Sequence, residues 1–160
     1  MGNHIRLNQA VPAAYKTLLL LNDESSAAAG VAGLEPLLIE LVKIRCSQIN
    51  GCAFCLRMHI RDAISHGETQ DRLAVLPAWR DTQYFTPEER HALAIAESIT
   101  LISDRLILPQ DEVAALNDEQ IAAVEWVAIT INAFNRVAIS SHRCPQLTSG
   151  IPRPGSGGRQ

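Results

Sequence analysis

The sequence predicts an all-α fold of about six helices. Hydrophobic residues make up 47% of the 160 positions, whereas aromatic residues make up only 4%. Ala, Leu and Ile dominate the apolar residues, and this composition favours helices packed on helices over a β-sandwich. The length suits one domain with a hydrophobic core of its own. We therefore expect a single helical domain over residues 1–144 and a flexible Pro- and Gly-rich tail over residues 145–160.

Prolines and turn residues mark the helices of the first part of the chain. Proline is favoured at the first helical position, so a first helix is expected to begin near Pro12 and to close at the polar run 22–26. A second helix is expected to begin near Pro36, because apolar side chains follow it at helical spacing. It should end at Asn50-Gly51, a pair typical of turns.

The later helices have equally clear boundaries. A third helix is expected to start at or just before Cys52 and to end at Gly67, where a left-handed cap is favoured. Residues 86–89 (TPEE) form a capping-box signature for a helix that reaches about Ser103. Beyond it we expect a short helix after Pro109 and a last long helix from Asn117 to about Ser141.

Charge and hydropathy disfavour two classes of partner. Lys and Arg total 14 against 17 Asp and Glu, which gives a net charge of -3, so we expect no nucleic-acid partner. The longest apolar runs fall short of the ~20 residues that span a bilayer, so we expect no membrane partner. The N-terminus lacks the apolar stretch and cleavage site of a secretory signal, and a cytoplasmic location is expected.

The cysteines are clustered. Three of the four, Cys46, Cys52 and Cys55, lie within ten residues, and the fourth is Cys144. Secreted scaffolds spread their cysteines to link distant loops of small domains. In a reducing cytosol, a cluster instead indicates metal binding or thiol chemistry.

Thiol chemistry accounts for the arrangement around this cluster. At about 100° per residue, Cys52, Cys55 and His59 fall on one face of the third helix. Cys55 and His59 are four residues apart, so the imidazole can accept the thiol proton, and the helix N-terminus also lowers a thiol pKa. Two cysteines at this spacing can form a disulfide, and one sulfur can trap a sulfenic acid on the other.

Two other interpretations of the same residues stay open. Small and apolar residues at this spacing also form ordinary core stripes, which need no chemistry. A zinc site would need a fourth ligand beyond Cys52, Cys55 and His59, supplied by Cys46, His66 or His142. The preferred interpretation involves no metal and no cofactor.

The run from Glu40 to His59, ELVKIRCSQINGCAFCLRMH, closely resembles the core of the alkylhydroperoxidase D (AhpD)-like, carboxymuconolactone decarboxylase superfamily. The specific feature is a glutamate twelve residues before the CxxC and a histidine four residues after it. The similarity extends more weakly to residues 86–90 and 132–136, so it covers most of residues 12–142.

The resemblance implies an AhpD-like helical fold that assembles into homotrimers or homohexamers and reduces peroxides. By position, Cys55 matches the peroxidatic sulfur and Cys52 the resolving one, while Glu40 and His59 match the proton relay. Phe54 departs from the pattern, because the best-studied AhpD branch carries a relay histidine between the two cysteines. The decarboxylase branch typically lacks the CxxC, which disfavours decarboxylation of a ring lactone.

The expected function is therefore that of a thiol-dependent peroxidase. Its partners would be a peroxide substrate and a thiol reductant such as a dihydrolipoyl protein, a thioredoxin or a similar protein. A general disulfide reductase and a non-enzymatic redox-sensing or metal-binding helical module are the alternatives. Amphipathic helices in a chain of this length also leave apolar surface for neighbouring subunits.

The remaining polar and aromatic residues carry structural expectations. Cys46 is expected to be a buried small residue and Cys144 an exposed free thiol. His66 is expected to complement a helix C-terminus, and His91 and His142 to lie at the surface or at an interface. Three polar residues of the last helix, Asn132, Asn135 and Arg136, are expected to bridge helices or subunits. Both tryptophans, Trp79 and Trp126, are expected to anchor the core.

Overall fold

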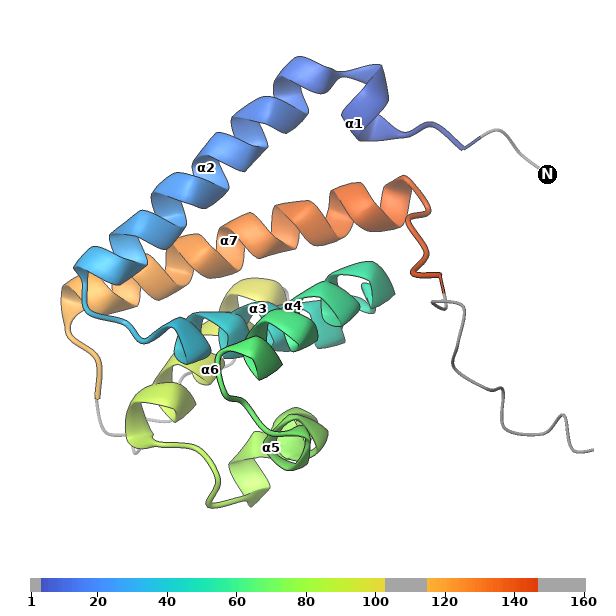
Figure 1. The fold of residues 1–160 in the computed structure, drawn as a ribbon. Coiled ribbons are helices and arrows are strands. Elements are labelled where there is room, and N and C mark those ends of the chain that lie inside the picture. Colours follow the sequence, from blue (N-terminus) through green and yellow to red (C-terminus); the bar gives the residue numbers. More distant parts are fainter. Residues whose placement is uncertain (1–3, 103–114, 147–160) are drawn as a thin grey trace, which may run out of the picture.

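The computed structural model describes residues 4–102 and 115–146. Within them the chain forms helices and no strand, which confirms the all-α prediction (Figure 1). The elements, in chain order, are α1 (Leu7–Ala10), α2 (Pro12–Val31), α3 (Pro36–Asn50), α4 (Ala53–Ser65), α5 (Gln70–Val75), the 3-10 helix η1 (Leu76–Asp81), α6 (Pro87–Thr100) and α7 (Asp118–Ser140).

Helix α3 is at the centre of the packing. It contacts α4, α6 and α7, and α7 in turn lies along α2 (Figure 1). The core has two main parts, one shared by α2, α3, α6 and α7 and one between α3, α4, η1 and α6. Because α3 contributes to both, it holds the start of α4 at a fixed position against α7.

Local sequence signals set several of the helix ends. Pro36 occupies the first turn of α3, and Gly51 ends that helix at φ +68°, a left-handed conformation that glycine adopts at little cost. Thr86 and Asn117 each form a capping box, with Glu89 and Gln120 respectively, at the starts of α6 and α7. These starts agree with the sequence predictions.

Other boundaries differ from prediction. Residues 22–26 do not end the first helix, which continues to Val31. The Ser25 hydroxyl donates to the Asn22 carbonyl within the helix, so the polar run is accommodated, and the alanines that follow have high helix propensity. Helix α6 ends at Thr100, slightly before the predicted end. The short helix expected after Pro109 and most of the expected tail lie outside the described residues.

Two predictions about single side chains were wrong. Trp126 is 48% exposed on α7, whereas Trp79 is 1% exposed and does anchor the core. His91 is buried, not at the surface, and its Nδ1 accepts a hydrogen bond from the backbone N–H of Leu116 at 3.3 Å. The difference arises because the chain before α7 passes over α6 at His91, a long-range contact that spacing does not predict.

No helix within residues 4–102 or 115–146 is both long and apolar enough to cross a bilayer.

Candidate active site

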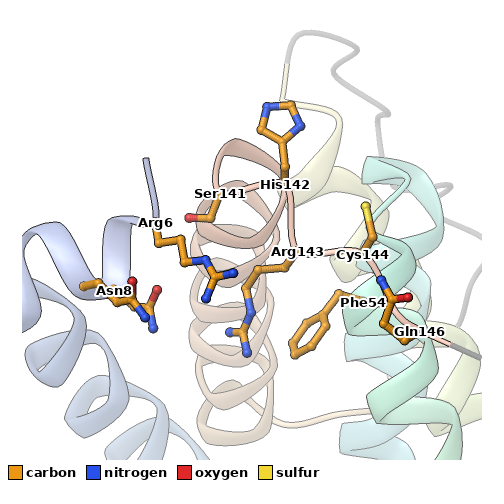
Figure 2. A pocket seen from close by; sticks show the side chains of 9 residues that line it. Arg6, Asn8, Phe54, Ser141, His142, Arg143, Cys144 and Gln146 are labelled. Carbon is orange, nitrogen blue, oxygen red and sulfur yellow. The ribbon is translucent and has the colours of Figure 1, made fainter. Parts of the chain in front are cut away.

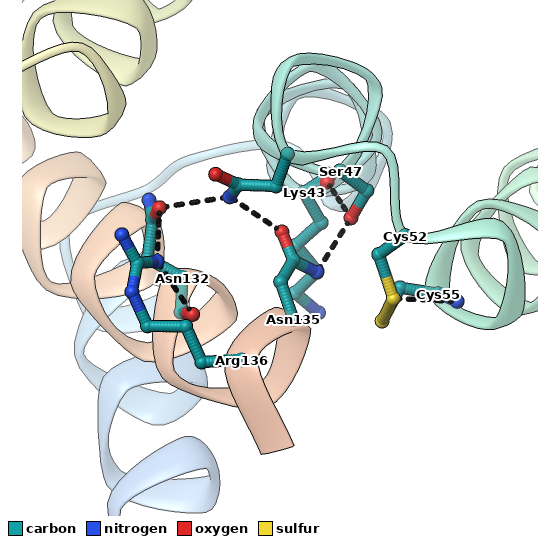
Figure 3. Close-up of a disulfide and its surroundings, with 8 residues drawn as sticks. Lys43, Ser47, Cys52, Cys55, Asn132, Asn135 and Arg136 are labelled. Carbon is teal, nitrogen blue, oxygen red and sulfur yellow. Dashed lines mark hydrogen bonds between the residues drawn. A yellow bond between two sulfur atoms is a disulfide. The ribbon is translucent and has the colours of Figure 1, made fainter. Parts of the chain in front are cut away.

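The cysteine pair lies at the tight junction between α3 and α4. Cys52 is the N-cap residue of α4, and its Sγ accepts a hydrogen bond from the backbone N–H of Cys55 at 3.4 Å. The two cysteines form a disulfide with a Cα–Cα separation of 5.4 Å (Figure 3). Both are buried, Cys52 with 1% and Cys55 with 2% of its surface exposed. Only a small reactant that enters a pocket could therefore reach either sulfur.

Glu40 and His59 form a second pair, contributed by α3 and α4. The Nδ1 atom of His59 lies 2.9 Å from Oε2 of Glu40, and Lys43 Nζ donates to the other carboxylate oxygen at 3.0 Å. Both Glu40 and His59 are buried. A buried carboxylate is stable only when it is paired and hydrogen-bonded, and these two partners satisfy that requirement.

The carboxylate of Glu40 stays ionised in this setting. Burial alone would raise its pKa, but the hydrogen bond from His59 and the charge of Lys43 outweigh burial, so the pKa lies below the ordinary value. An ionised carboxylate at Nδ1 holds a proton on that nitrogen. In the neutral tautomer that carries this proton, Nε2 is the acceptor. Nε2 is buried and has no hydrogen-bond partner in the described part of the chain.

Cys55 and His59 line the same pocket. This reaction pocket has a volume of about 220 Å³, and α2, α4 and α7 supply its walls. Most of the wall is apolar and includes Tyr15, Leu19, Met58, Phe134 and Val137. The predicted face of α4 is thus present for Cys55 and His59, because residues four apart on a helix project to one side. Cys52, which was expected on the same face, precedes the helix as its N-cap and does not line this pocket.

Cys52 faces another opening. It lines a separate pocket of about 190 Å³ together with Gly51, Ala138 and His142. The structure therefore brings the four predicted residues into one region as two pairs. A disulfide joins Cys52 and Cys55, and a hydrogen bond joins Glu40 and His59. Cys55 and His59 link the two pairs through the reaction pocket.

A buried polar network holds α7 against α3 next to the disulfide. Asn135 is fully buried, its Nδ2 donates to Ser47 Oγ at 3.0 Å, and its Oδ1 accepts from Asn50 Nδ2 at 2.8 Å (Figure 3). Asn50 also donates to Asn132 Oδ1, which accepts from Arg136 as well. The expectation that these α7 residues bridge helices is confirmed for Asn132 and Asn135, and the bridge fixes the α3 end that precedes Cys52. The hydrogen bonds of Arg136 in the described segments go to Asn132 of the same helix.

The other two cysteines are separate from the pair. Cys46 lies fully buried in the core shared by α2, α3, α6 and α7, and burial raises its pKa to about 11. Its Sγ faces the Ala96 carbonyl at 3.8 Å. Cys144 is a free, exposed thiol that follows α7. Both placements agree with the sequence predictions.

Comparison with known proteins gives the family. A family model described as the carboxymuconolactone decarboxylase family matches residues 12–98. This chain belongs to the carboxymuconolactone decarboxylase family. The match contains the CxxC, Glu40 and His59, which are the residues that carried the resemblance in the sequence.

Two relatives extend this assignment. The chain is 41% identical over 106 residues to the uncharacterized protein YdfG of Bacillus subtilis (strain 168), which covers 63% of this chain and 71% of that protein. It also superposes, with a TM-score of 0.80 and 28% identity, on the crystal structure of a protein of unknown function from Agrobacterium tumefaciens that is described as a candidate antioxidant defence protein AhpD. That superposition covers 92% of this chain and 100% of the other, so the AhpD-like fold is shown.

The possible metal ligands of this carboxymuconolactone decarboxylase family member differ from the zinc set that the sequence left open as an alternative. Ligand atoms of Glu40, His59 and Asp62 lie within 4.8 Å of one another. Lys43 already neutralises Glu40, and the two pocket sulfurs are bonded to each other. His66 Nδ1 lies 2.7 Å from the Asp62 carbonyl at the end of α4, as expected for a residue that complements a helix C-terminus. The geometry thus favours a hydrogen-bonded acid–base pair over a cysteine-ligated zinc ion.

Several pocket residues were missed in the sequence. Phe134 lies inside the stretch 132–136, which resembles the family, but nothing in the sequence assigns Phe134 itself to a pocket. Tyr15 and Arg143 carry no motif, and they reach the pocket only because α2 and the end of α7 pack beside α4. The ring edge of Phe134 meets Tyr15 in a T-shaped contact of 6.2 Å between centroids.

Proposed function

We propose that this protein is a thiol-dependent peroxidase that reduces organic hydroperoxides through Cys55 and Cys52. The observation that carries the proposal is the pocket that Cys55 and His59 share, together with a buried Nε2 atom of His59 that has no hydrogen-bond partner among the described residues. Family membership and the AhpD-like fold of the Agrobacterium tumefaciens protein support an antioxidant role.

The first step is activation of Cys55 in the reduced protein. Glu40 keeps the proton of His59 on Nδ1, so that Nε2 accepts the proton of the Cys55 thiol, directly or through a water molecule. The N-terminus of α4 adds positive partial charge near the resulting thiolate. The carboxylate of Glu40 then balances the charge of the imidazolium.

Two further steps complete the oxidation. The Cys55 thiolate attacks the distal peroxide oxygen, the O–O bond breaks, and the leaving alkoxide takes the proton from His59 to depart as an alcohol. The sulfenic acid on Cys55 is then attacked by Cys52, so that the S–S bond forms, the S–O bond breaks, and water leaves. Two electrons pass from the dithiol to the peroxide, and a thiol reductant later returns them.

Burial of the sulfurs argues for a peroxide substrate over a protein disulfide. Both sulfurs are nearly inaccessible from bulk water, and the reaction pocket measures only about 220 Å³. A small organic hydroperoxide with an apolar body fits such a pocket, whereas a folded protein disulfide does not. The same pocket favours an enzyme over a module that only senses redox state, because sensing needs no enclosed apolar wall.

Partners and assembly follow from the same proposal. The reductant is a dithiol protein, and thiol reductants of this class work in the cytoplasm. The burial that excludes a folded protein disulfide also favours a dithiol on a flexible arm, as in a dihydrolipoyl protein, over the dithiol on the surface of a folded thioredoxin. We also propose a homotrimer or homohexamer. Large apolar side chains are exposed along α2 and α7, and neighbouring subunits would cover them: Leu20 56%, Val31 92%, Trp126 48% and Ile129 42%.

Rapid mixing of the fully reduced protein with tert-butyl hydroperoxide tests the activity. Thiol counting should show the loss of two of the four thiols per chain. Cys55→Ser should abolish the loss, and Cys52→Ser should stop the reaction at a sulfenic acid that dimedone traps. Cys46→Ala is the matched control, because it removes a cysteine that lines neither the reaction pocket nor the pocket of Cys52, and it should leave the two-thiol loss intact.

Two results would contradict the proposal. Peroxide consumption that survives Cys55→Ser would remove Cys55 from its role. Stoichiometric zinc, released from untagged protein by acid, would support the metal-binding alternative. The mass in solution, measured by light scattering, tests the assembly, and a monomer at micromolar concentration would contradict it.

A further inference from the structure

A cationic pocket adjoins the reaction pocket. It has a volume of about 380 Å³ and is lined by two arginines, Arg6 and Arg143, among polar residues that include Asn8 and Gln9. No Asp or Glu of the described segments lines it. Arg6 reaches in from the N-terminal segment and Arg143 from the segment that follows α7, toward the same space (Figure 2). We refer to it as the arginine pocket.

Neither arginine is neutralised within the described residues. The ion pairs of the described segments involve other side chains, so both guanidinium groups present their charge to the arginine pocket. Two uncompensated arginines around one cavity form a site for an anion, and the planar guanidinium matches a carboxylate in particular.

The arginines are held in place by contacts with ordered parts of the fold. The guanidinium of Arg143 lies 3.9 Å from the centroid of the Phe54 ring, a stacking that leaves its N–H edge free. The backbone N–H of Arg143 donates to the Ala138 carbonyl at 2.9 Å. On the other side, Leu7 N–H donates to Ser141 Oγ at 3.1 Å and ties the segment of Arg6 to the end of α7. The backbone that carries both arginines and the side chain of Arg143 are therefore held in place before a ligand binds, which lowers the cost of binding.

The arginine pocket and the reaction pocket share two residues, Phe54 and Arg143. A ligand can thus lie across both, with an apolar body beside Cys55 and an anionic end at Arg143. The reaction pocket contributes Leu19, Met58 and Phe134 to the apolar part. This combination of an apolar wall and a cationic end matches an amphipathic acid.

We propose that the preferred substrates are hydroperoxides that carry a carboxylate on an apolar chain, and that Arg143 and Arg6 bind the carboxylate. This inference rests on the proposed peroxidase function. The carboxylate takes no part in the electron transfer: the O–O bond still breaks at Cys55 and the product is the corresponding hydroxy acid. Its role is to orient the chain so that the hydroperoxide group reaches the sulfur.

Binding to the oxidised protein tests the site without any turnover. Calorimetric titration with decanoate and with methyl decanoate should give at least about tenfold tighter binding of the acid, because a charged hydrogen-bonded pair is involved. Arg143→Gln and Arg6→Gln should each reduce this difference in affinity between acid and ester. Arg143→Lys, which keeps the positive charge, should retain part of it. Arg61→Gln, which removes an exposed charge from α4 outside both pockets, is the matched control and should keep the difference.

The kinetic test compares a fatty-acid hydroperoxide with its methyl ester on the reduced protein. The acid should oxidise the thiols at least about tenfold faster, and Arg143→Gln should bring the ratio of the two rates close to one. Circular dichroism of each variant verifies that it folds. Equal binding of decanoate and its ester, together with equal rates, overturns the inference.

The two proposals fail in different ways. If tert-butyl hydroperoxide oxidises the thiols while acid and ester bind equally, the carboxylate site is wrong and the peroxidase function stands. If decanoate binds through Arg143 and every hydroperoxide leaves the thiols intact, the site is right as an acid-binding site, and its proposed use in peroxide reduction is overturned.

Discussion

The Nδ1 atom of His59 lies 2.9 Å from Oε2 of Glu40, although the two residues are nineteen positions apart. Helix α3 presents the carboxylate and α4 presents the imidazole, so the contact depends on how these helices pack. The contact orients the ring of His59, which lines the reaction pocket, and with the ring its buried Nε2 atom. The roles proposed for both residues can be separated by substitution.

Removal of the Glu40 carboxylate should slow the oxidation of Cys55. Glu40→Gln no longer fixes the proton on Nδ1, and we expect the rate with tert-butyl hydroperoxide to fall about tenfold, whereas His59→Gln should lower it about a hundredfold. Stopped-flow measurements at neutral pH check both rates. Glu35→Gln removes an exposed carboxylate just before α3 and is the matched control. Equal rates for Glu40→Gln and Glu35→Gln would exclude Glu40 from the relay.

Glu97 should make the fold sensitive to acid. Burial raises its pKa, but hydrogen bonds from Arg80, Trp79 and Arg45 outweigh burial, so that its pKa lies below the ordinary value. The unfolded chain therefore binds the proton first as the pH falls. The stabilisation is fully present above the ordinary carboxyl pKa of about 4.3 and is lost as the pH falls through the lower, folded-state pKa.

Replacement of Glu97 tests this predicted loss of stability at low pH. Glu97→Gln should lower the free energy of unfolding near neutral pH by about 3 kcal/mol, because it leaves two arginines without their shared partner. Urea titrations at a series of pH values should also show a weaker loss of stability toward acid than in the unchanged protein. Glu125→Gln, an exposed position on α7, should change neither quantity. An unaltered pH dependence in Glu97→Gln would contradict the assignment.

Asn135 should be important for the α3–α7 contact. Asn135→Ala leaves Ser47 and Asn50 with fewer partners in a buried setting, and we expect a loss of about 2 kcal/mol in unfolding free energy. Ser47→Ala and the double variant complete a mutant cycle. Because Asn135 and Ser47 are bonded, the double variant should lose less than the sum of the single losses, by about 0.5 kcal/mol or more. Strictly additive losses in unfolding free energy would mean that the Asn135–Ser47 hydrogen bond contributes nothing to stability.

The two free cysteines should differ sharply toward alkylating reagents. Cys46 is fully buried and its pKa is about 11, so its thiol stays protonated and shielded in mildly alkaline buffer, whereas Cys144 is exposed. Brief treatment of the native protein with iodoacetamide, followed by peptide mass mapping, should label Cys144 alone of these two. Denaturant should make Cys46 reactive. Rapid labelling of Cys46 in the native state would contradict its placement in the core.

Sequence alone predicted the parts of this molecule that depend on neighbouring residues. Pro36, the capping box at Thr86 and the glycine after α3 fixed helix starts and ends, and the four-residue spacing of Cys55 and His59 placed both on one face. The predicted end of the first helix was wrong because the polar run 22–26 is compatible with a helix, as the Ser25 hydrogen bond within α2 shows. The alanines that follow favour a helix, and α7 packs along α2.

The parts of the site that depend on distant segments were not predictable from spacing. Glu40 entered the sequence prediction only through the family resemblance, since a single glutamate on an amphipathic helix is usually solvated. Arg6 and Arg143 are separated by nearly the whole chain, and no motif marks either one. They share a pocket because the chain before α2 packs against the end of α7.

Cys52 caps α4 with a sulfur atom, where most helices use an oxygen. After reduction, the same Cys55 N–H and the positive end of the helix face a sulfur that can carry a full negative charge. A donor that stabilises the dithiol form more than the disulfide raises the reduction potential of the pair. The first turn of α4 therefore influences how readily the protein accepts electrons from its reductant. A change in that turn alone would alter the redox equilibrium while both cysteines stay in place.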